Sequence, residues 1–196
     1  MPTTIYFIRH CEADNTIAKT DTRPLTSRGW ADRETITRTL EDIHLDRLYS
    51  SPYKRTLDTI GDLAQARGMD ITVEDGLHER VGGSTDRELM EQGTVEAFVR
   101  KQWQDMEYTL GDCESLGSTQ RRNVEVILRL LKAEQGKTIA VATHGCALSC
   151  IANYFEPELK FDYFMYLIPR LPCIVRVDFD GTNLIAMEEL TLKRTI

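Results

Sequence analysis

The sequence is poor in the features that mark secreted, membrane-embedded or disulfide-stabilised proteins. Its 196 residues include five cysteines, an odd number without a Cys-x-x-Cys pair, which argues for reduced thiols rather than a disulfide framework. No apolar run approaches the length of a membrane span, no basic segment followed by an apolar stretch opens the chain, and no Asn-x-Ser/Thr site occurs. We therefore expect a soluble, cytoplasmic protein with no membrane partner.

Positive charge is scarce relative to negative charge. Lys and Arg number 24 against 31 Asp and Glu, which leaves a formal net charge of −7. No nucleic-acid partner is expected, because proteins that bind nucleic acids present a basic surface. Any anion site must therefore be a local cluster of basic residues. The 41% hydrophobic and 28% charged content is ordinary for a globular protein, and we predict one domain over residues 1–196.

Strand and helix patterns alternate along the chain. Apolar and β-branched stretches predict strands at 4–8, 45–51, 69–75 and 137–143, and a C-terminal hairpin at 173–190 that turns at Asp180-Gly181. Amphipathic spacing and cap residues predict helices at 27–42, 52–67, 115–135 and 147–155. Residues 84–112 have an irregular helical pattern of mixed charge, which we interpret as a small helical lid insertion. The alternation predicts an α/β fold: a three-layer sandwich with a mainly parallel central sheet.

Two of the predicted strands end in a histidine. The strands 4–8 and 137–143 each run directly into one, and the carboxyl ends of parallel strands form the edge where open α/β sheets bind ligands. The predicted strand 45–51 is followed by Arg55, and the predicted strand 69–75 is followed by Glu79, so we expect both side chains at the same edge. The sequence thus predicts an anion site built from Arg9, His10, Arg55, Glu79, His144 and Gly145.

These residue types suit phosphoryl transfer through a phosphohistidine. A neutral imidazole is a competent nucleophile near neutral pH, because its ordinary pKa is about 6.5, and we assign this role to His10. Arg9 and Arg55 would hold the phosphate oxygens, and His144 would donate a further hydrogen bond. Glu79 would give a proton to the leaving alkoxide and later take one from the attacking water, and a nearby phosphate dianion would favour its protonated form.

Five short motifs, in order, resemble those of the histidine phosphatase superfamily, also called phosphoglycerate-mutase-like. They are RHCE at 9–12, LTSRG at 25–29, SPYKRTLDT at 51–59, LHERVGG at 77–83 and HG at 144–145. The resemblance implies His10 as the nucleophile and Arg9, Arg55 and His144 as the phosphate pocket. It also implies Glu79 as proton donor, a small phosphorylated substrate, and no metal or other cofactor.

The chain departs from the family pattern at two places. Cys11 replaces the glycine that usually follows the nucleophile, and we include it among the substrate-binding residues together with Gly145. Neighbouring arginines would lower the pKa of its thiol, so we hypothesise reversible oxidation, alone or with Cys146; the alternative is a thiol turned inward as packing. The asparagine often found six residues after the nucleophile is replaced by Thr16, with Asn15 one position early.

Other functions compete with a phosphatase. A zinc site is one alternative, although the adjacent Arg9 would oppose a cation. It would require four residues to converge: His10, Cys11, His144 and Cys146. A catalytically silent binding module has no need of the complete set of reactive residues.

A phosphoglycerate mutase shares the phosphohistidine but needs a basic lid that excludes water, whereas acids outnumber bases in the insertion. The phosphatase is therefore favoured, and the acidic insertion disfavours highly phosphorylated ligands such as inositol polyphosphates. The oligomeric state has no signal in the sequence.

Several other polar residues receive non-catalytic interpretations. Arg121 and Arg122 are interpreted as helix-surface residues, Lys54 as solvated, and His44 and His78 as non-catalytic.

Overall fold

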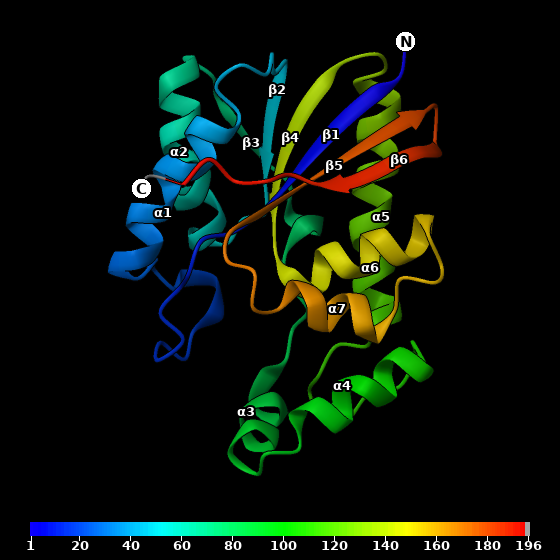
Figure 1. The fold of residues 1–196 in the computed structure, drawn as a ribbon. Helices are drawn as coiled ribbons and strands as arrows, with labels where there is room; N and C mark the ends of the chain where they lie inside the picture. The colour runs from blue at the N-terminus through cyan, green and yellow to red at the C-terminus, as the bar shows by residue number, and fades with distance from the viewer. Residues whose placement is uncertain (195–196) are drawn as a thin grey trace.

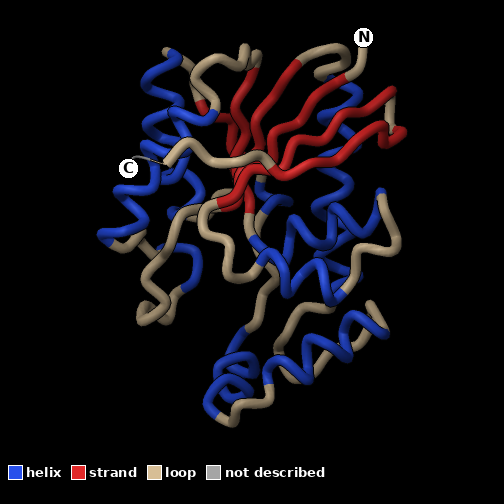
Figure 2. The backbone as a smooth tube through the Cα atoms, in the orientation of Figure 1, coloured by secondary structure: helices blue, strands red, loops and turns tan. Residues whose placement is uncertain are grey.

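The computed structural model describes residues 1–194 and contains one six-stranded, mixed sheet with the strand order β3-β2-β4-β1-β5-β6 (Figures 1 and 2). Four strands are parallel to one another: β1 (Thr3–Arg9), β2 (Arg47–Ser50), β3 (Ile71–Val73) and β4 (Thr138–Thr143). The other two form an antiparallel hairpin on the β1 side: β5 (Cys173–Asp180) and β6 (Asn183–Glu189). The predicted mainly parallel α/β sheet is confirmed.

Helices cover both faces of the sheet, which gives three layers (Figure 1). The helices α1 (Ser27–Thr39) and α2 (Lys54–Arg67) cover one face, where Tyr6 and Ile8 of β1 point into an apolar cluster. The opposite face, to which Ile5 and Phe7 point, is covered by α5 (Leu116–Ala133), α6 (Gly145–Phe155) and α7 (Phe161–Leu167). Because successive β1 side chains point to opposite faces, one strand contributes to both halves of the core.

The insertion contains two helices, α3 (Gly83–Glu91) and α4 (Val95–Gln104), which lie at the bottom of the view in Figure 1. Phe98, Val99 and Trp103 of α4 are buried and cluster with Leu116 and Phe161. This cluster attaches the insertion to the body of the protein. Two short 3-10 helices, Thr20–Thr22 and Asp75–Leu77, lie in the connecting segments.

Most of the predicted elements are present, with shifted ends. The helix predicted at 27–42 ends at Thr39, the strand predicted at 69–75 is only three residues long, and α7 has no counterpart among the predictions. The C-terminal hairpin turns where expected, at Gly181, whose φ of 59° lies in the left-handed region that favours glycine. Within residues 1–194, no helix combines the length and apolarity needed to cross a membrane.

The start of α1 explains the LTSRG motif. The Oγ1 atom of Thr26 accepts a hydrogen bond from the backbone N–H of Gly29 at 3.0 Å and thereby caps the helix. A Cβ atom on Gly29 would lie 2.1 Å from the carbonyl oxygen of Glu12, so only glycine allows this approach. The helix start is thus packed directly against the loop that follows β1.

Candidate active site

The ends of β1 and β4 bring the two histidines together. Arg9 pairs with Thr143 in the parallel register, and the backbone N–H of His10 donates to the carbonyl of Thr143 at 3.1 Å. The ring centroids of His10 and His144 are 5.3 Å apart and their planes are inclined by 62°. The predicted meeting of these two strand ends is confirmed.

His10 is held in one tautomer and kept neutral. Its Nδ1 atom lies 2.7 Å from the carbonyl oxygen of Cys11, which can only accept, so Nδ1 carries the proton and Nε2 keeps its lone pair. Burial lowers the pKa of His10 well below its ordinary value, and the charges of Arg55 and Arg9 lower it further. At neutral pH this imidazole is therefore neutral and has an unprotonated Nε2 atom, which is the state that a nucleophilic imidazole requires.

His144 is fully buried and also neutral. Its Nε2 atom lies 2.7 Å from the Oγ atom of Ser51, and its ring meets Tyr53 edge-on at 5.1 Å between centroids. Burial lowers the pKa of His144 well below its ordinary value, and the charge of Arg55 adds to this effect. The Ser51 hydroxyl thus positions the second histidine beside the first.

The two predicted phosphate-binding arginines lie in this region in different environments. Arg9 is 5% exposed, and its Nη1 atom donates to the carbonyls of Leu167, Ile168 and Arg170 at the end of α7, while its Nε atom has no partner within residues 1–194. A Cβ atom on Gly145 would lie 3.1 Å from that Nε, so glycine makes room for the guanidinium.

Arg55 lies over the ring of Tyr53, 4.9 Å from its centroid, and donates to the carbonyl of Thr20 at 2.6 Å. Burial lowers the pKa of Arg55 to about 10, against an opposing effect of the Glu79 charge. Arg55 stays protonated at neutral pH, because this value lies well above it.

Glu79 is bound at the N-terminus of α6, the helix that follows His144. Its Oε2 atom accepts from the backbone N–H of Cys146 at 3.0 Å, and its Oε1 atom accepts from those of Ala147 at 2.9 Å and Arg80 at 2.8 Å. These three hydrogen bonds fix the carboxyl group of Glu79 at the start of α6, next to the segment that follows His144.

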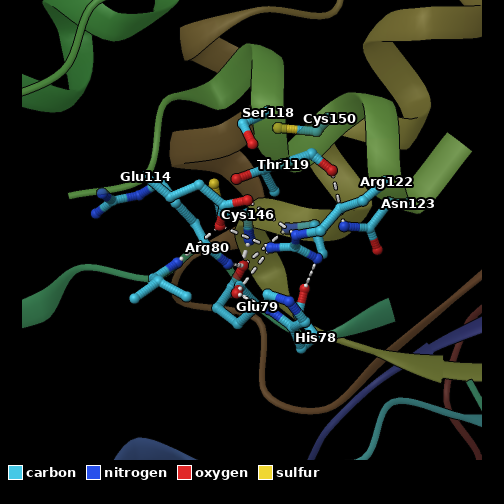
Figure 3. A network of polar contacts seen from close by, with 12 residues as sticks. His78, Glu79, Arg80, Glu114, Ser118, Thr119, Arg122, Asn123, Cys146 and Cys150 are labelled. Atoms are coloured by element: carbon cyan, nitrogen blue, oxygen red, sulfur yellow. Dashed lines mark hydrogen bonds and ion pairs between the residues drawn. The ribbon is translucent and has the colours of Figure 1, made fainter. Parts of the chain in front are cut away.

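The loop that carries Glu79 is fixed by Arg122, as Figure 3 shows. Arg122 donates to the carbonyls of Gly76, His78 and Glu79 at 3.0, 2.5 and 3.0 Å, and its guanidinium pairs with Glu114 at 2.8 Å. Its side chain is only 19% exposed. The interpretation of Arg122 as a surface residue is therefore wrong. Successive residues on a helix point about 100° apart, so Arg122 points into the buried network while the preceding residue points to the solvent. Its neighbour Arg121 is exposed and pairs with Glu107 at the surface.

Cys11 is a packing residue rather than a reactive thiol. It is fully buried in the cluster between the sheet and α1 and α2, and burial raises the pKa of its thiol to about 12. Its backbone N–H donates to Thr59 and its carbonyl accepts from His10. The predicted lowering of its pKa is wrong, because desolvation outweighs the nearby charges. Cys11 has no free polar group for a substrate, and its assignment as a substrate contact is corrected accordingly.

Cys146 packs in a different cluster, beside Cys150 and the insertion, which argues against a Cys11–Cys146 disulfide. The zinc alternative fails for the same reason, since it needs both of these thiols next to the two histidines. Within residues 1–194, no three His, Cys, Asp or Glu side chains converge in a way that could hold a metal ion.

A cavity of about 550 Å³ opens beside these residues. Arg55 and Glu79 are among the residues that line it, whereas Arg9, His10 and His144 are not. Sequence reasoning missed three arginines of its wall, Arg23, Arg80 and Arg87; of these, Arg80 lies within the LHERVGG motif, which was a usable signal. The rest of the wall comes from the 15–20 segment, the residue before α2, α3 and the residue before it, α4, α6, and α7 with the residue after it: Asn15, Thr16, Ala18, Thr20, Tyr53, Gly82, Gly83, Asp86, Met90, Val99, Cys146, Phe164 and Ile168.

The chain is similar to known proteins in sequence and in fold. A probable phosphatase of Schizosaccharomyces pombe is 22% identical over 197 residues, which cover 94% of this chain and 68% of the relative. A probable phosphoglycerate mutase of Salmonella arizonae is 25% identical over 161 residues, which cover 76% of this chain and 73% of that protein. A phosphoserine phosphatase from Entamoeba histolytica, solved with 3-phosphoglyceric acid, has the same fold, with a TM-score of 0.75, 21% identity and 98% coverage of both chains.

A family model covers nearly the whole chain and every motif described above. It is the model of the histidine phosphatase superfamily (branch 1), and it matches residues 5–188. Together with the fold, this match shows that the chain belongs to the histidine phosphatase superfamily.

Proposed function

We propose that this member of the superfamily is a phosphomonoester hydrolase that acts through a phosphohistidine at His10. The observation that carries the proposal is the state of His10: a buried, neutral imidazole whose Nδ1–H is engaged by the Cys11 carbonyl, beside His144 and two arginines. This arrangement supplies a nucleophilic nitrogen and the positive charge that phosphoryl transfer requires.

In the first step, the Nε2 lone pair of His10 attacks phosphorus and the bond from phosphorus to the ester oxygen breaks. The guanidinium groups of Arg9 and Arg55 stabilise the charge on the three equatorial oxygens, and His144 contributes a hydrogen bond. Arg9 can offer phosphate its Nε–H group, which has no partner within residues 1–194. A second hydrogen bond requires one Nη1–H group to leave the carbonyls at the end of α7.

Glu79 supplies the proton that the leaving oxygen needs. Oε2 is the atom suited to carry it, because it accepts only the Cys146 N–H, whereas Oε1 accepts two. After the alcohol leaves, the Glu79 carboxylate takes a proton from water, whose oxygen attacks phosphorus and releases phosphate and neutral His10. The returned proton restores Glu79 for the next cycle.

Hydrolysis is favoured over mutase activity by the character of the insertion. A mutase keeps water from its phosphohistidine until the phosphoryl group returns to the substrate, and this favours an extensive cover with basic anchors. The two helices α3 and α4 are nine and ten residues long, and Arg100 of α4 is paired with Glu96 rather than directed to a ligand. Such a short cover fits the admission of water.

The experiment is rapid-quench trapping of the phosphoenzyme with labelled substrate. An acid-labile, base-stable phosphoryl group is expected in the native protein and not in His10→Ala; label retained by His10→Ala would overturn the assignment. Activity on an aryl phosphate is expected to survive EDTA and to be inhibited by vanadate, because His10, Arg9 and Arg55 already supply the nucleophile and the charge. Loss of activity on chelation that zinc restores would instead favour a metal enzyme.

A further inference from the structure

The cavity is positively charged although the protein as a whole is negative. Four arginines line it against two carboxylates: Arg23, Arg55, Arg80 and Arg87 against Glu79 and Asp86. Both carboxylates are already engaged. Asp86 forms an ion pair with Arg80, and Glu79 accepts three backbone hydrogen bonds. With Arg80 paired to Asp86, three arginines of the wall have no carboxylate partner: Arg23, Arg55 and Arg87. Arg55 is assigned to the phosphate, so Arg23 and Arg87 remain for a second group.

Arg23 and Arg87 line the same cavity. Arg23 comes from the loop before α1, and Arg87 comes from α3 in the insertion. Burial lowers the pKa of Arg23, and the charge of Arg87 lowers it further, in agreement with the place of both guanidinium groups on the wall of one cavity.

Within residues 1–194, neither Arg23 nor Arg87 forms an ion pair. Arg23 donates only to the carbonyl of Ile17 at 2.7 Å and to the side-chain oxygen of Asn15 at 3.4 Å. Asp14, whose charge raises the pKa of Arg23, forms no ion pair with it and is hydrogen-bonded to Thr16. Two cations on one cavity wall with no counterion are costly, and an anion placed between them would relieve that repulsion.

The two arginines are at the right place for a second group of the substrate. Arg23 also contributes to lowering the pKa values of Arg55 and His10, after burial and nearer charges, so it lies within electrostatic range of the reacting centre. The phosphate itself is held by Arg9 and Arg55. The cations Arg23 and Arg87 therefore extend the positive region outward from the phosphate, along the cavity wall.

We propose that the substrate is a phosphomonoester whose alcohol part carries one further anionic group, a carboxylate or a second phosphate, bound between Arg23 and Arg87. The proposal rests on the phosphatase function proposed above and adds the substrate class. Selectivity follows because a neutral analogue leaves the two arginines without a counterion, whereas the anion gains two charge-assisted hydrogen bonds.

The test compares substrates that differ in one group. Phosphate release is measured with 3-phosphoglycerate and glycerol 3-phosphate, which differ by a carboxylate in place of a hydroxymethyl group, and with fructose 1,6-bisphosphate and fructose 6-phosphate. The readout is the ratio of kcat/KM for the anionic substrate to that for its partner. In the native protein we expect a ratio above about 10 for at least one pair, since partly exposed charge pairs near a protein surface reach this order.

Arg87→Gln and Arg23→Gln should each lower the ratio about 5- to 10-fold, and raising KCl should lower it in the native protein. Arg100→Gln is the matched control, because Arg100 lies on α4, pairs with Glu96 and does not line the cavity. Within residues 1–194, the side chain of Arg87 on α3 makes no hydrogen bond that its replacement would remove, so the Arg87→Gln variant stays informative if Arg23→Gln is unstable.

The outcomes separate the two proposals. A ratio near one for both pairs in the native protein, or a ratio unchanged in Arg87→Gln, overturns the second-anion site while the phosphatase stands. If no phosphate is released from any of the four compounds or from an aryl phosphate, and no phosphoenzyme forms, the phosphatase itself is overturned.

Discussion

Replacing Glu79 with glutamine separates its chemical role from its structural one. The carboxylate accepts three backbone N–H groups, two at Oε1 and one at Oε2. A glutamine amide has one acceptor oxygen, and in its best orientation it keeps the hydrogen bonds from Arg80 and Ala147. Its NH₂ group then faces the N–H of Cys146, donor against donor.

The structural penalty of Glu79→Gln can be estimated from this geometry. One partly buried N–H group loses its acceptor, which costs about 1–3 kcal/mol of unfolding free energy. At about 2–4 °C per kcal/mol for a chain of this size, the melting temperature should fall by roughly 2–12 °C. The fold is therefore expected to survive, and kinetic measurements on the variant remain meaningful.

The chemical penalty depends on the leaving group. An alkoxide must be protonated as it leaves, and loss of general acid catalysis lowers the rate by about 10²–10⁴. A 4-nitrophenoxide leaves with little protonation. Because kcat/KM includes only the steps up to formation of the phosphoenzyme, it should fall strongly for glycerol 3-phosphate and weakly for 4-nitrophenyl phosphate.

The second step adds an independent signature of the same role. Without a base for water, the phosphoenzyme should accumulate, so stopped-flow mixing of Glu79→Gln with 4-nitrophenyl phosphate should give a burst of nitrophenolate followed by slow turnover. Equal losses of kcat/KM on both substrates, with no burst, would refute the acid-base role and leave Glu79 as a residue that only fixes the start of α6.

Three further predictions follow from the burial of charged and titratable groups. The pKa values of His10 and His144 are lowered in the folded state, so below about pH 6.5 these histidines bind protons in the unfolded chain but not in the folded protein. As the pH falls, the unfolding free energy should therefore fall by up to about 1.4 kcal/mol per pH unit for each histidine. Urea unfolding between pH 7.5 and pH 5 measures this slope, and His144→Asn should make it smaller. Cys11→Ala should lose activity to peroxide in parallel with the native protein, because a thiol with a pKa of about 12 carries almost no thiolate at neutral pH. A Cys11→Ala variant that resists peroxide better than the native protein would contradict the buried, unreactive thiol. Arg122→Met should lower the unfolding free energy by about 3 kcal/mol in denaturant titrations, since Glu114 and three carbonyls lose their partner, whereas Arg121→Met at the exposed neighbour should change it by less than about 1 kcal/mol.

The positions of Arg9, His10 and His144 could be predicted from the sequence, because each follows a short, apolar, β-branched strand. Parallel pairing of two such strands leaves their ends at one edge, and the observed Arg9–Thr143 register does this. Arg55 could be placed for a similar reason, since Pro52 and the following residues mark the start of a helix after β2. Local patterns thus carry these residues to the site.

The sequence could not place Arg23 and Arg87 in the cavity wall. Neither belongs to a periodic pattern, and one lies in an irregular loop while the other lies on an exposed helix of the insertion. Their proximity depends on how α3 and α4 attach to the body through Phe98, Val99 and Trp103. Such long-range attachment has no local signature.

The sequence by itself determined the α/β alternation, the strand ends and the identity of the candidate catalytic groups, because strand and helix periodicities are properties of neighbouring residues. Only the tertiary structure decided their states. The tautomer of His10 depends on where the Cys11 carbonyl points, the high pKa of Cys11 depends on which side of the loop is desolvated, and the carboxylate of Glu79 is held by N–H groups 67 and 68 positions along the chain. Protonation states are set by burial and by hydrogen bonds in space, and these exist only after the chain has folded.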